Sequence, residues 1–324
     1  MKAIVINELG GPDVMRVSEI SNPQPKANEA LIKIAYSGVN FIDVYFREGR
    51  YKAQLPFILG QEASGTVAAA GGDVRSVKVG DRVAQTTVMG SYADLQAVPA
   101  EKLVKIPEGV SDRDAAAVML QGMTAHYLAY SAYPLKKGET ALVHAAAGGV
   151  GLLLVQMAHN IGARVIATVS TEEKAELARQ AGADHIIFYT QQDFEAETKR
   201  IMGGQGVDVV YDSVGKTTFE KGLNVLRPRG YMILFGGSSG AVPPFDLIQL
   251  SQKGSLYVTR PTLGHYVATR AELEQRSGAV FEMIRTGKLK LRTEHLYPLA
   301  EAAQAHRDLE SRKTTGKLLL VASE

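Results

Sequence analysis

One stretch, from Leu142 to Gly151, constrains the fold of this chain more than any other. It reads Leu-Val-His-Ala-Ala-Ala-Gly-Gly-Val-Gly and joins a short apolar run to a segment with helical spacing. Ala146, Gly148 and Gly151 hold the three special positions of the G-x-G-x-x-G/A fingerprint, with alanine replacing the first glycine. The fingerprint needs a tight turn, a backbone that approaches a pyrophosphate, and a small residue where helix meets sheet. It predicts a dinucleotide site at a helix N-terminus, although such turns also serve plain helix–strand packing.

The segments around this turn alternate between strand and helix. We expect strands at residues 141–143, 163–169, 207–211 and 231–235, and helices at 149–160 and 172–181. Ser170 and Glu173 are placed as a capping box for the second helix. This rhythm predicts an α/β fold in which a doubly wound parallel sheet has helices on both faces.

The remainder of the chain shows a different pattern of apolar and turn residues. Before residue 122, short alternating runs such as 3–6, 30–35 and 63–68 are broken by Gly, Pro and Asn turns, as in a β-rich domain. The last sixty or so residues combine a helix near 271–286 with a closing strand at 317–321, and we expect them to return to the first domain. The predicted domains are therefore 1–122 plus 263–324, and 123–262.

The end of the second strand of the parallel sheet indicates which nicotinamide is bound. An NAD site places Asp or Glu there, about 20 residues after the glycine turn, to hold the ribose hydroxyls. Here the strand ends in Ser170 and Thr171, and Lys174 follows one turn later. Hydroxyls beside an ammonium suit the 2′-phosphate of NADPH, although Glu172 and Glu173 weigh against it. In the alternative, Ser170 only caps a helix and Lys174 is a solvated charge.

The composition excludes several classes of protein. Because the chain has no cysteine, it has no disulfide, thiolate zinc site, iron–sulfur cluster or cysteine nucleophile. Its 36 basic and 34 acidic residues give a net charge of +2, so neither nucleic acid nor membrane is expected as the main partner. The apolar runs are too short for a signal peptide or a spanning helix, and we expect a cytoplasmic protein.

Six ordered segments resemble the medium-chain dehydrogenase/reductase superfamily, and within it the zinc-free NADPH:quinone oxidoreductases related to zeta-crystallin. The resemblance covers essentially the whole chain and implies a Rossmann domain, a GroES-like catalytic domain and a homodimer, with residues 255–258 as an edge strand that pairs across a two-fold axis. The matching segments are residues 38–43, 60–65, 80–83, 144–151, 211–215 and 254–261.

The resemblance also accounts for the missing metal. Zinc alcohol dehydrogenases of the superfamily carry Cys, His and Cys where this chain has Asn40, Gln61 and Leu120, which form no stable zinc site. The four-cysteine loop is missing, and the histidines form no H-E-x-x-H pair, so we expect them to be structural or exposed. Without a Lewis acid, alcohol oxidation is disfavoured, and reduction of an electron-poor acceptor such as a quinone is favoured.

On the acceptor side, the resemblance implies that Asn40, Tyr45 and Tyr51 face the cleft near the nicotinamide. A tyrosine offers a flat wall and a hydroxyl, and Asn40 has an amide that orients a carboxamide or an acceptor carbonyl. The alternative for each tyrosine is ordinary half-buried packing. Gln61 is either a remnant of the zinc site or a hydrogen-bond donor to the acceptor. No dedicated general acid is evident, so we expect positioning to supply most of the catalysis.

On the cofactor side, the resemblance implies a larger set of contacts. Tyr189 is expected near the 2′-phosphate, Val258 and Arg260 near the nicotinamide, and Arg312 at a distal point, although Arg260 has a purely structural alternative. The other matching positions are Tyr127, Ala147, Gly148, Gly149, Val150, Ser170, Lys174, Ser213, Phe235, Gly236, Gly237 and Ser238.

Three functions remain open at this stage. The first is zinc-independent hydride transfer from NADPH to a quinone. The second is NADPH-dependent reduction of the double bond of enones or alkenals, which related zinc-free members perform. The third is a protein that binds NADPH without catalysis, as a structural or RNA-binding protein, and the near-neutral charge argues against RNA.

Overall fold

The computed structural model describes residues 1–322 and divides into two compact units. Unit 1 comprises Met1–Met123 and Val267–Glu324, and unit 2 comprises Thr124–Tyr266. The boundaries that we predicted lie one and four residues earlier in the chain. The first boundary falls inside α2 (Asp112–Tyr127), and the second follows α8 (Leu263–Tyr266).

Unit 2 contains a six-stranded sheet in which every neighbouring pair of strands is parallel. Its order is β11-β10-β9-β12-β13-β14, so the direction of strand addition reverses between β9 and β12. Ligands of such sheets bind outside the carboxyl ends of the strands at this reversal. The strands are β9 (Thr140–Val143), β10 (Arg164–Val169), β11 (His185–Phe188), β12 (Val207–Asp212), β13 (Leu226–Leu234) and β14 (Tyr257–Thr259). The predicted doubly wound sheet is confirmed.

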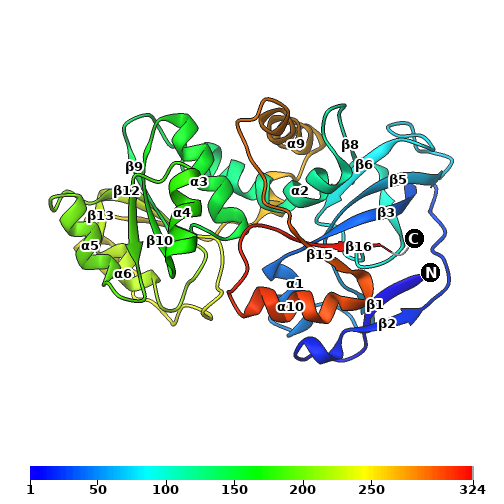
Figure 1. Ribbon diagram of the computed structural model, residues 1–324, viewed down its shortest axis with the longest axis horizontal. Coiled ribbons are helices and arrows are strands. Elements are labelled where there is room, and N and C mark those ends of the chain that lie inside the picture. The colour runs from blue at the N-terminus through cyan, green and yellow to red at the C-terminus, as the bar shows by residue number, and fades with distance from the viewer. Residues whose placement is uncertain (323–324) are drawn as a thin grey trace. The chain divides into compact units, whose positions relative to one another are not determined.

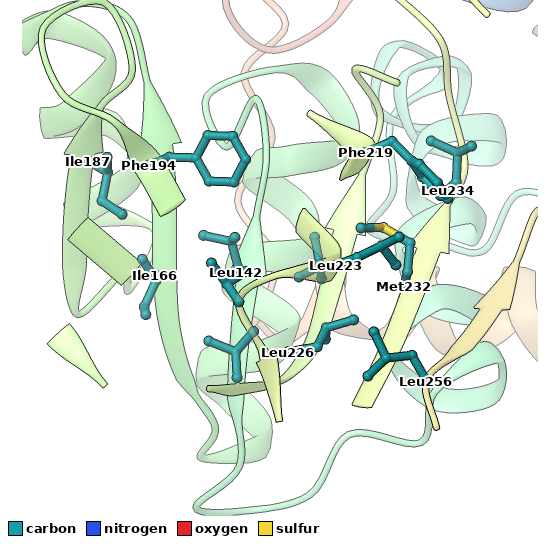
Figure 2. Close-up of a cluster of buried hydrophobic side chains, with 13 residues drawn as sticks. Leu142, Ile166, Ile187, Phe194, Phe219, Leu223, Leu226, Met232, Leu234 and Leu256 are labelled. Atoms are coloured by element: carbon teal, nitrogen blue, oxygen red, sulfur yellow. The ribbon is translucent and has the colours of Figure 1, made fainter. Parts of the chain in front are cut away.

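Helices cover both faces of this sheet. Figure 1 shows α3 and α4 together on one face, with α5 and α6 on the other. A cluster of buried hydrophobic side chains packs between the sheet and the helices on the α5/α6 face. It extends from Ile187 to Leu256 and includes Phe194 of α5 and Phe219 of α6 (Figure 2). The helices are α3 (Gly149–Ile161), α4 (Glu172–Gln180), α5 (Phe194–Ile201), α6 (Phe219–Leu223) and α7 (Ile248–Gln252).

Two local predictions in unit 2 are wrong. The N-cap of α4 is Thr171, whose hydroxyl accepts from the Lys174 N–H, because the helix begins at Glu172, one residue later than a cap at Ser170 requires. β13 starts at Leu226, five residues before the predicted strand, even though it contains Pro228. The strand passes through this region because its register against β12 shifts there and Arg229 adopts a φ of 60°.

Unit 1 is built on a seven-stranded sheet. Six strands follow the order β15-β16-β3-β5-β6-β8, β7 also pairs with β3, and every pair except β15·β16 is antiparallel. Alternate residues of β3 and β5, such as Ile32, Ile34 and Val67, point into its core. The strands are β3 (Glu29–Val39), β5 (Glu62–Ala70), β6 (Arg82–Thr86), β7 (Leu95–Pro99), β8 (Val104–Lys105), β15 (His295–Pro298) and β16 (Leu318–Val321).

A smaller sheet and several helices complete unit 1. The small sheet has the order β2-β1-β4, and its Ile4 and Ile6 pack with Leu318 and Leu320 of β16. The remaining strands and α-helices are β1 (Lys2–Ile6), β2 (Arg16–Glu19), β4 (Phe57–Ile58), α1 (Phe41–Arg47), α9 (Arg270–Arg285) and α10 (Ala302–Glu310). Within residues 1–322, no helix is both long enough and apolar enough to cross a bilayer.

Candidate cofactor and acceptor sites

The glycine turn lies between β9 and α3, at the carboxyl end of a central strand. Ala145 adopts a φ of 51°, and its carbonyl accepts the Gly148 N–H at 2.9 Å, which closes the turn. A Cβ on Gly151 would lie 2.3 Å from the Ala145 carbonyl oxygen, so only glycine permits this packing of helix on turn. Gly148 is the N-cap of α3 and provides no side-chain cap. The first N–H groups of α3 are thus suited to an anionic ligand.

His144, which opens the turn, serves the core. Its Nδ1 lies 3.0 Å from the Thr168 hydroxyl, and its ring packs edge-on against Phe194 at 4.6 Å between ring centroids. Burial lowers the pKa of the imidazole, which keeps the ring neutral. A structural role fits this placement.

Three polar residues, Ser170, Lys174 and Tyr189, lie where β10 and β11 end. Ser170 follows β10 and Tyr189 follows β11, and the N–H of Tyr189 donates to the Val169 carbonyl at 3.1 Å. The Lys174 ammonium, in the first turn of α4, lies 3.3 Å from the Ser170 hydroxyl. This places an ammonium, a hydroxyl and a half-exposed phenol at one sheet edge.

One of the two acids that weighed against a phosphate there, Glu172, is engaged elsewhere. The Glu172 carboxylate accepts from Arg179, two turns along α4, at 2.5 Å. Part of its charge is therefore compensated on the outer surface of that helix.

The loops after β12 and β13 are joined by a dense set of hydrogen bonds. Asp212, fully buried at the end of β12, accepts from the backbone N–H groups of Val214 and Gly215 and from the Thr218 hydroxyl. The N–H of Ser238 in the second loop donates to the Ser213 carbonyl at 3.2 Å. Sequence reasoning included Asp212 in a matching segment but gave it no role, and its three bonds show that it organises this loop.

The other predicted cofactor residues of unit 2 differ in exposure and in their contacts. Arg260 follows β14, and its guanidinium donates to the Gly236 carbonyl at 3.0 Å. Val258, on β14, is 38% exposed. Tyr127 is buried and stacks on Tyr266 at 4.3 Å between ring centroids. Ala147 is buried within the turn, whereas Gly149, Val150, Phe235 and Gly237 are partly buried. Arg312 belongs to unit 1, where it is exposed and has a φ of 59°.

In unit 1, Tyr45 and Tyr51 form an aromatic pair at the C-terminal end of α1. Their ring centroids lie 5.5 Å apart in an edge-on arrangement, and the N–H of Tyr51 donates to the Tyr45 carbonyl. The Arg50 guanidinium lies 5.4 Å from the centroid of the Tyr45 ring. Tyr51 is 39% exposed and Tyr45 is buried, so Tyr51 presents the more accessible ring.

Asn40 lies in a buried polar cluster with Glu62, Gln121 and Lys317. Its Nδ2 donates to the Glu62 carboxylate at 2.8 Å and to the Gly38 carbonyl at 3.2 Å. Its Oδ1 accepts from the Lys317 ammonium at 2.8 Å and from the Gln121 amide at 3.2 Å. All four hydrogen-bonding positions of this amide are thus occupied.

Strand register explains why residues so distant in sequence meet here. β16 pairs Leu318 with Val39 of β3, which brings Lys317 beside Asn40. β3 in turn pairs Ser37 with Ala63 of β5, which brings Glu62 to the same place. The Lys317 ammonium and the Glu62 carboxylate lie 2.5 Å apart, and both are almost completely buried.

The residues at the expected zinc positions do not fit zinc. Asn40 is committed to its four neighbours, and Leu120 contributes only its backbone N–H, which donates to Glu62 Oε1 at 2.6 Å. In the part of the chain that the structure describes, no group of three His, Asp or Glu side chains is arranged to hold a metal ion. No reaction step is therefore assigned to a metal.

Gln61, the third of these positions, is 7% exposed. Its Nε2 is buried and has no hydrogen-bond partner among residues 1–322. A buried amide donor without a partner needs an explanation, and a bound molecule that accepts its hydrogen bond would provide it.

Sequence reasoning missed a second buried chain of polar groups that begins at α1. Arg47 lies 2.8 Å from His306 Nδ1, His306 Nε2 lies 3.1 Å from the Tyr92 hydroxyl, and that hydroxyl donates to Asp43 Oδ2 at 3.0 Å. Because a guanidinium only donates, His306 Nδ1 must accept, and the ring proton resides on Nε2. Asp43 also accepts the Asn40 N–H, so the chain fixes the start of α1. No local sequence signal marks these residues as partners.

Comparisons with known proteins agree with this architecture. A family model described as an alcohol dehydrogenase GroES-like domain matches residues 26–108, and one described as a zinc-binding dehydrogenase matches residues 149–275. A quinone oxidoreductase of Pseudomonas aeruginosa is 44% identical over 322 residues, 99% of each chain. A 2-haloacrylate reductase of Burkholderia is 41% identical over 327 residues, 98% of each chain.

A solved structure matches the whole fold. The crystal structure of the Escherichia coli quinone oxidoreductase in complex with NADPH superimposes with a TM-score of 0.97 at 43% identity, covering 99% of this chain and all of that one. The resemblance drawn from the six segments is confirmed. The chain belongs to the quinone oxidoreductase family of the medium-chain dehydrogenase/reductase superfamily.

Proposed function

We propose that this protein is an NADPH-dependent quinone oxidoreductase that transfers a hydride without a metal ion. The glycine turn carries the proposal, because Gly148 and Gly151 leave the first turn of α3 uncapped and tightly packed, as a pyrophosphate site requires. The NADPH complex of the Escherichia coli relative supports the same cofactor.

The choice of NADPH over NADH depends on the end of β10. Lys174 and the Ser170 hydroxyl supply a cation and a donor for the 2′-phosphate, and Tyr189, at the end of the adjacent strand β11, offers a further hydroxyl. No acid follows β10 directly, so the group that holds the ribose of NAD is replaced.

We infer a quinone as the acceptor because hydride addition to a quinone needs little activation by the protein. Hydride addition to a quinone gives a delocalised phenolate-type anion, and water or a tyrosine hydroxyl later supplies its proton. Tyr45 and Tyr51 offer aromatic surface to a flat ring, and Gln61 offers a buried amide. Catalysis is then mainly positioning of the cofactor against the acceptor.

A second candidate is reduction of a conjugated carbon–carbon double bond, which the 41% identity to a 2-haloacrylate reductase favours. This reaction needs a donor to the acceptor carbonyl and a proton for the α-carbon. NADPH oxidation at 340 nm should therefore be followed with quinones, enones, alkenals and 2-haloacrylate. Fast turnover of quinones alone supports the proposal, and turnover confined to the alkenes replaces it with the second candidate. Tight NADPH binding without any turnover points to a non-catalytic binder.

We further propose that the protein is a cytoplasmic homodimer that pairs through β14. This strand lies at the edge of its sheet, with Tyr257 52% exposed, and Leu247 and Ile248 before it are 73% and 55% exposed. An open strand edge together with exposed apolar side chains favours pairing with a second copy. Sedimentation at micromolar concentration should give twice the chain mass of 34.9 kDa, and the mass of a monomer refutes the pairing.

A further inference from the structure

We propose that Lys317 is a positioning residue whose ammonium serves as a built-in cation for the acceptor site: it holds the Glu62 carboxylate and the Asn40 amide in one arrangement. This inference rests on the proposed function for its catalytic consequence and on the contacts within unit 1 for its geometry. It concerns the place that the zinc ligands occupy in the metal-dependent relatives of this fold.

The first support is the set of atoms around the ammonium. Lys317 Nζ lies 2.5 Å from Glu62 Oε2 and 2.8 Å from Asn40 Oδ1. Both ligands are oxygens, one charged and one neutral, as around a bound cation. The Lys317 residue is 3% exposed, so water does not screen this pair.

The second support is the shape of the backbone at Gly38. A Cβ there would lie 2.1 Å from Glu62 Oε2 and 2.8 Å from Lys317 Nζ. A larger residue at this position would push the ends of the Glu62 and Lys317 side chains away from strand β3, so glycine accommodates the pair where it lies. Gly38 is thus compatible with the present position of the ion pair.

The third support is the balance of charge. Burial lowers the pKa of Lys317, and the Glu62 carboxylate opposes that shift. The pair is neutral overall, which leaves no net negative charge to attract a metal ion. Lys317 and Glu62 together replace a charged metal centre with a covalently attached cation and its counter-ion.

The consequence for the reaction passes through Asn40. This residue is the N-cap of α1, and α1 carries Tyr45. The ammonium selects one orientation of the Asn40 amide, because Oδ1 must face Lys317 and Nδ2 must face Glu62. Loss of the ammonium removes one of the four hydrogen bonds that orient this amide and so weakens its hold on the residue that begins α1.

The test begins with Lys317→Ala, which removes three methylenes and the ammonium, a fragment equal to n-propylammonium. We expect a lower melting temperature, because the buried Glu62 carboxylate loses its counter-charge and keeps only the hydrogen bonds from Asn40 and Leu120. Added n-propylammonium should raise the melting temperature, whereas n-propanol, its uncharged counterpart, should not. The double variant Lys317→Ala/Glu62→Gln, which has no buried charge to satisfy, should not respond to either. An equal response to the amine and the alcohol overturns the proposal.

The catalytic part is tested in the double variant Lys317→Met/Glu62→Gln. This variant keeps the cluster neutral, and its melting temperature should recover most of the loss seen with Lys317→Met alone. Its kcat for a quinone should still fall about 10-fold or more, with the KM for NADPH unchanged, because positioning is lost without loss of the fold. A wild-type kcat in this stable double variant overturns the positioning role. If the amine rescues stability but the wild-type protein reduces no quinone, the built-in cation stands and the proposed function fails.

Discussion

The buried Asp43 carboxyl should give this protein an unusual dependence of stability on pH. Asp43 is fully buried, and burial raises its pKa from 3.8 to about 7. Between these two values the native protein holds a proton that the unfolded chain has released. A carboxyl whose pKa rises on folding contributes its full stabilisation of the native state at pH values below its pKa in the unfolded chain. This contribution to the free energy of unfolding is lost as the pH rises toward 7.

His306, in the same chain of hydrogen bonds, acts in the opposite direction. Burial, with the neighbouring Arg47 charge, lowers the pKa of His306 from 6.5 to about 3. In the unfolded chain the imidazole therefore binds a proton that it does not bind in the native protein. The free energy of unfolding consequently falls as the pH drops from 6.5 toward 3. Between about pH 4 and 6.5, the contributions of Asp43 and His306 oppose each other.

Asp43→Asn removes the contribution of Asp43 to the pH dependence of stability and leaves that of His306. The amide keeps an acceptor for the Tyr92 hydroxyl and the Asn40 N–H, but it does not titrate. The free energy of unfolding of the variant, relative to the wild type, should rise by about 1.4 kcal/mol for each pH unit in this range. From pH 5 to pH 6.5 the relative gain is about 2 kcal/mol.

Urea unfolding, followed by far-ultraviolet circular dichroism at both pH values, measures this difference. The exposed Asp73, changed to Asn, is the matched control for loss of a carboxylate at the surface. If the free-energy difference between Asp43→Asn and the wild type is the same at pH 5 and pH 6.5, Asp43 does not titrate in this range and the argument is refuted.

Three further substitutions test the cofactor site. Lys174→Ala should raise the KM for NADPH about 10-fold and leave the KM for NADH unchanged, because one charged contact with a 2′-phosphate is worth roughly 1.4 kcal/mol or more. An equal rise in the KM of both cofactors would mean that other residues bind the 2′-phosphate. Gly151→Val should lower the melting temperature and NADPH affinity, because its Cβ meets the Ala145 carbonyl oxygen at 2.3 Å, and unchanged calorimetric binding would contradict this packing argument. Asp212→Ala removes the acceptor of three hydrogen bonds and should cost about 3 kcal/mol in unfolding experiments, along with a higher KM for NADPH.

Features governed by neighbouring residues were predictable from the sequence. The glycine turn, the strands on either side of it and the helix that follows depend on local spacing, and each lies where the pattern placed it. The approach of Lys174 to Ser170 is also local, because one turn of helix separates them. The cap of α4 was misplaced by one residue because Ser170 and Thr171 are chemically equivalent candidates, and only the end of β10 decides between them.

Features that depend on strand register were not predictable. Lys317 meets Asn40 and Glu62 only because β16 lies beside β3 and β3 beside β5, with pairings that no single sequence reveals. The contact between Tyr92 and His306 spans 214 residues, and the contact between Arg47 and His306 spans 259. Neither residue type nor spacing indicates such contacts, so Asn40 was expected to orient a ligand when its amide is in fact occupied within the protein.

The central claim is that NADPH reduces a quinone here without a metal ion. The most direct test is the rate of NADPH oxidation at 340 nm with a quinone, after exhaustive dialysis against a chelator and confirmation of zinc content by elemental analysis. The account predicts full turnover in zinc-depleted protein, a clear preference for NADPH over NADH, and no stimulation by added zinc. Turnover that disappears on dialysis and returns with zinc would contradict it.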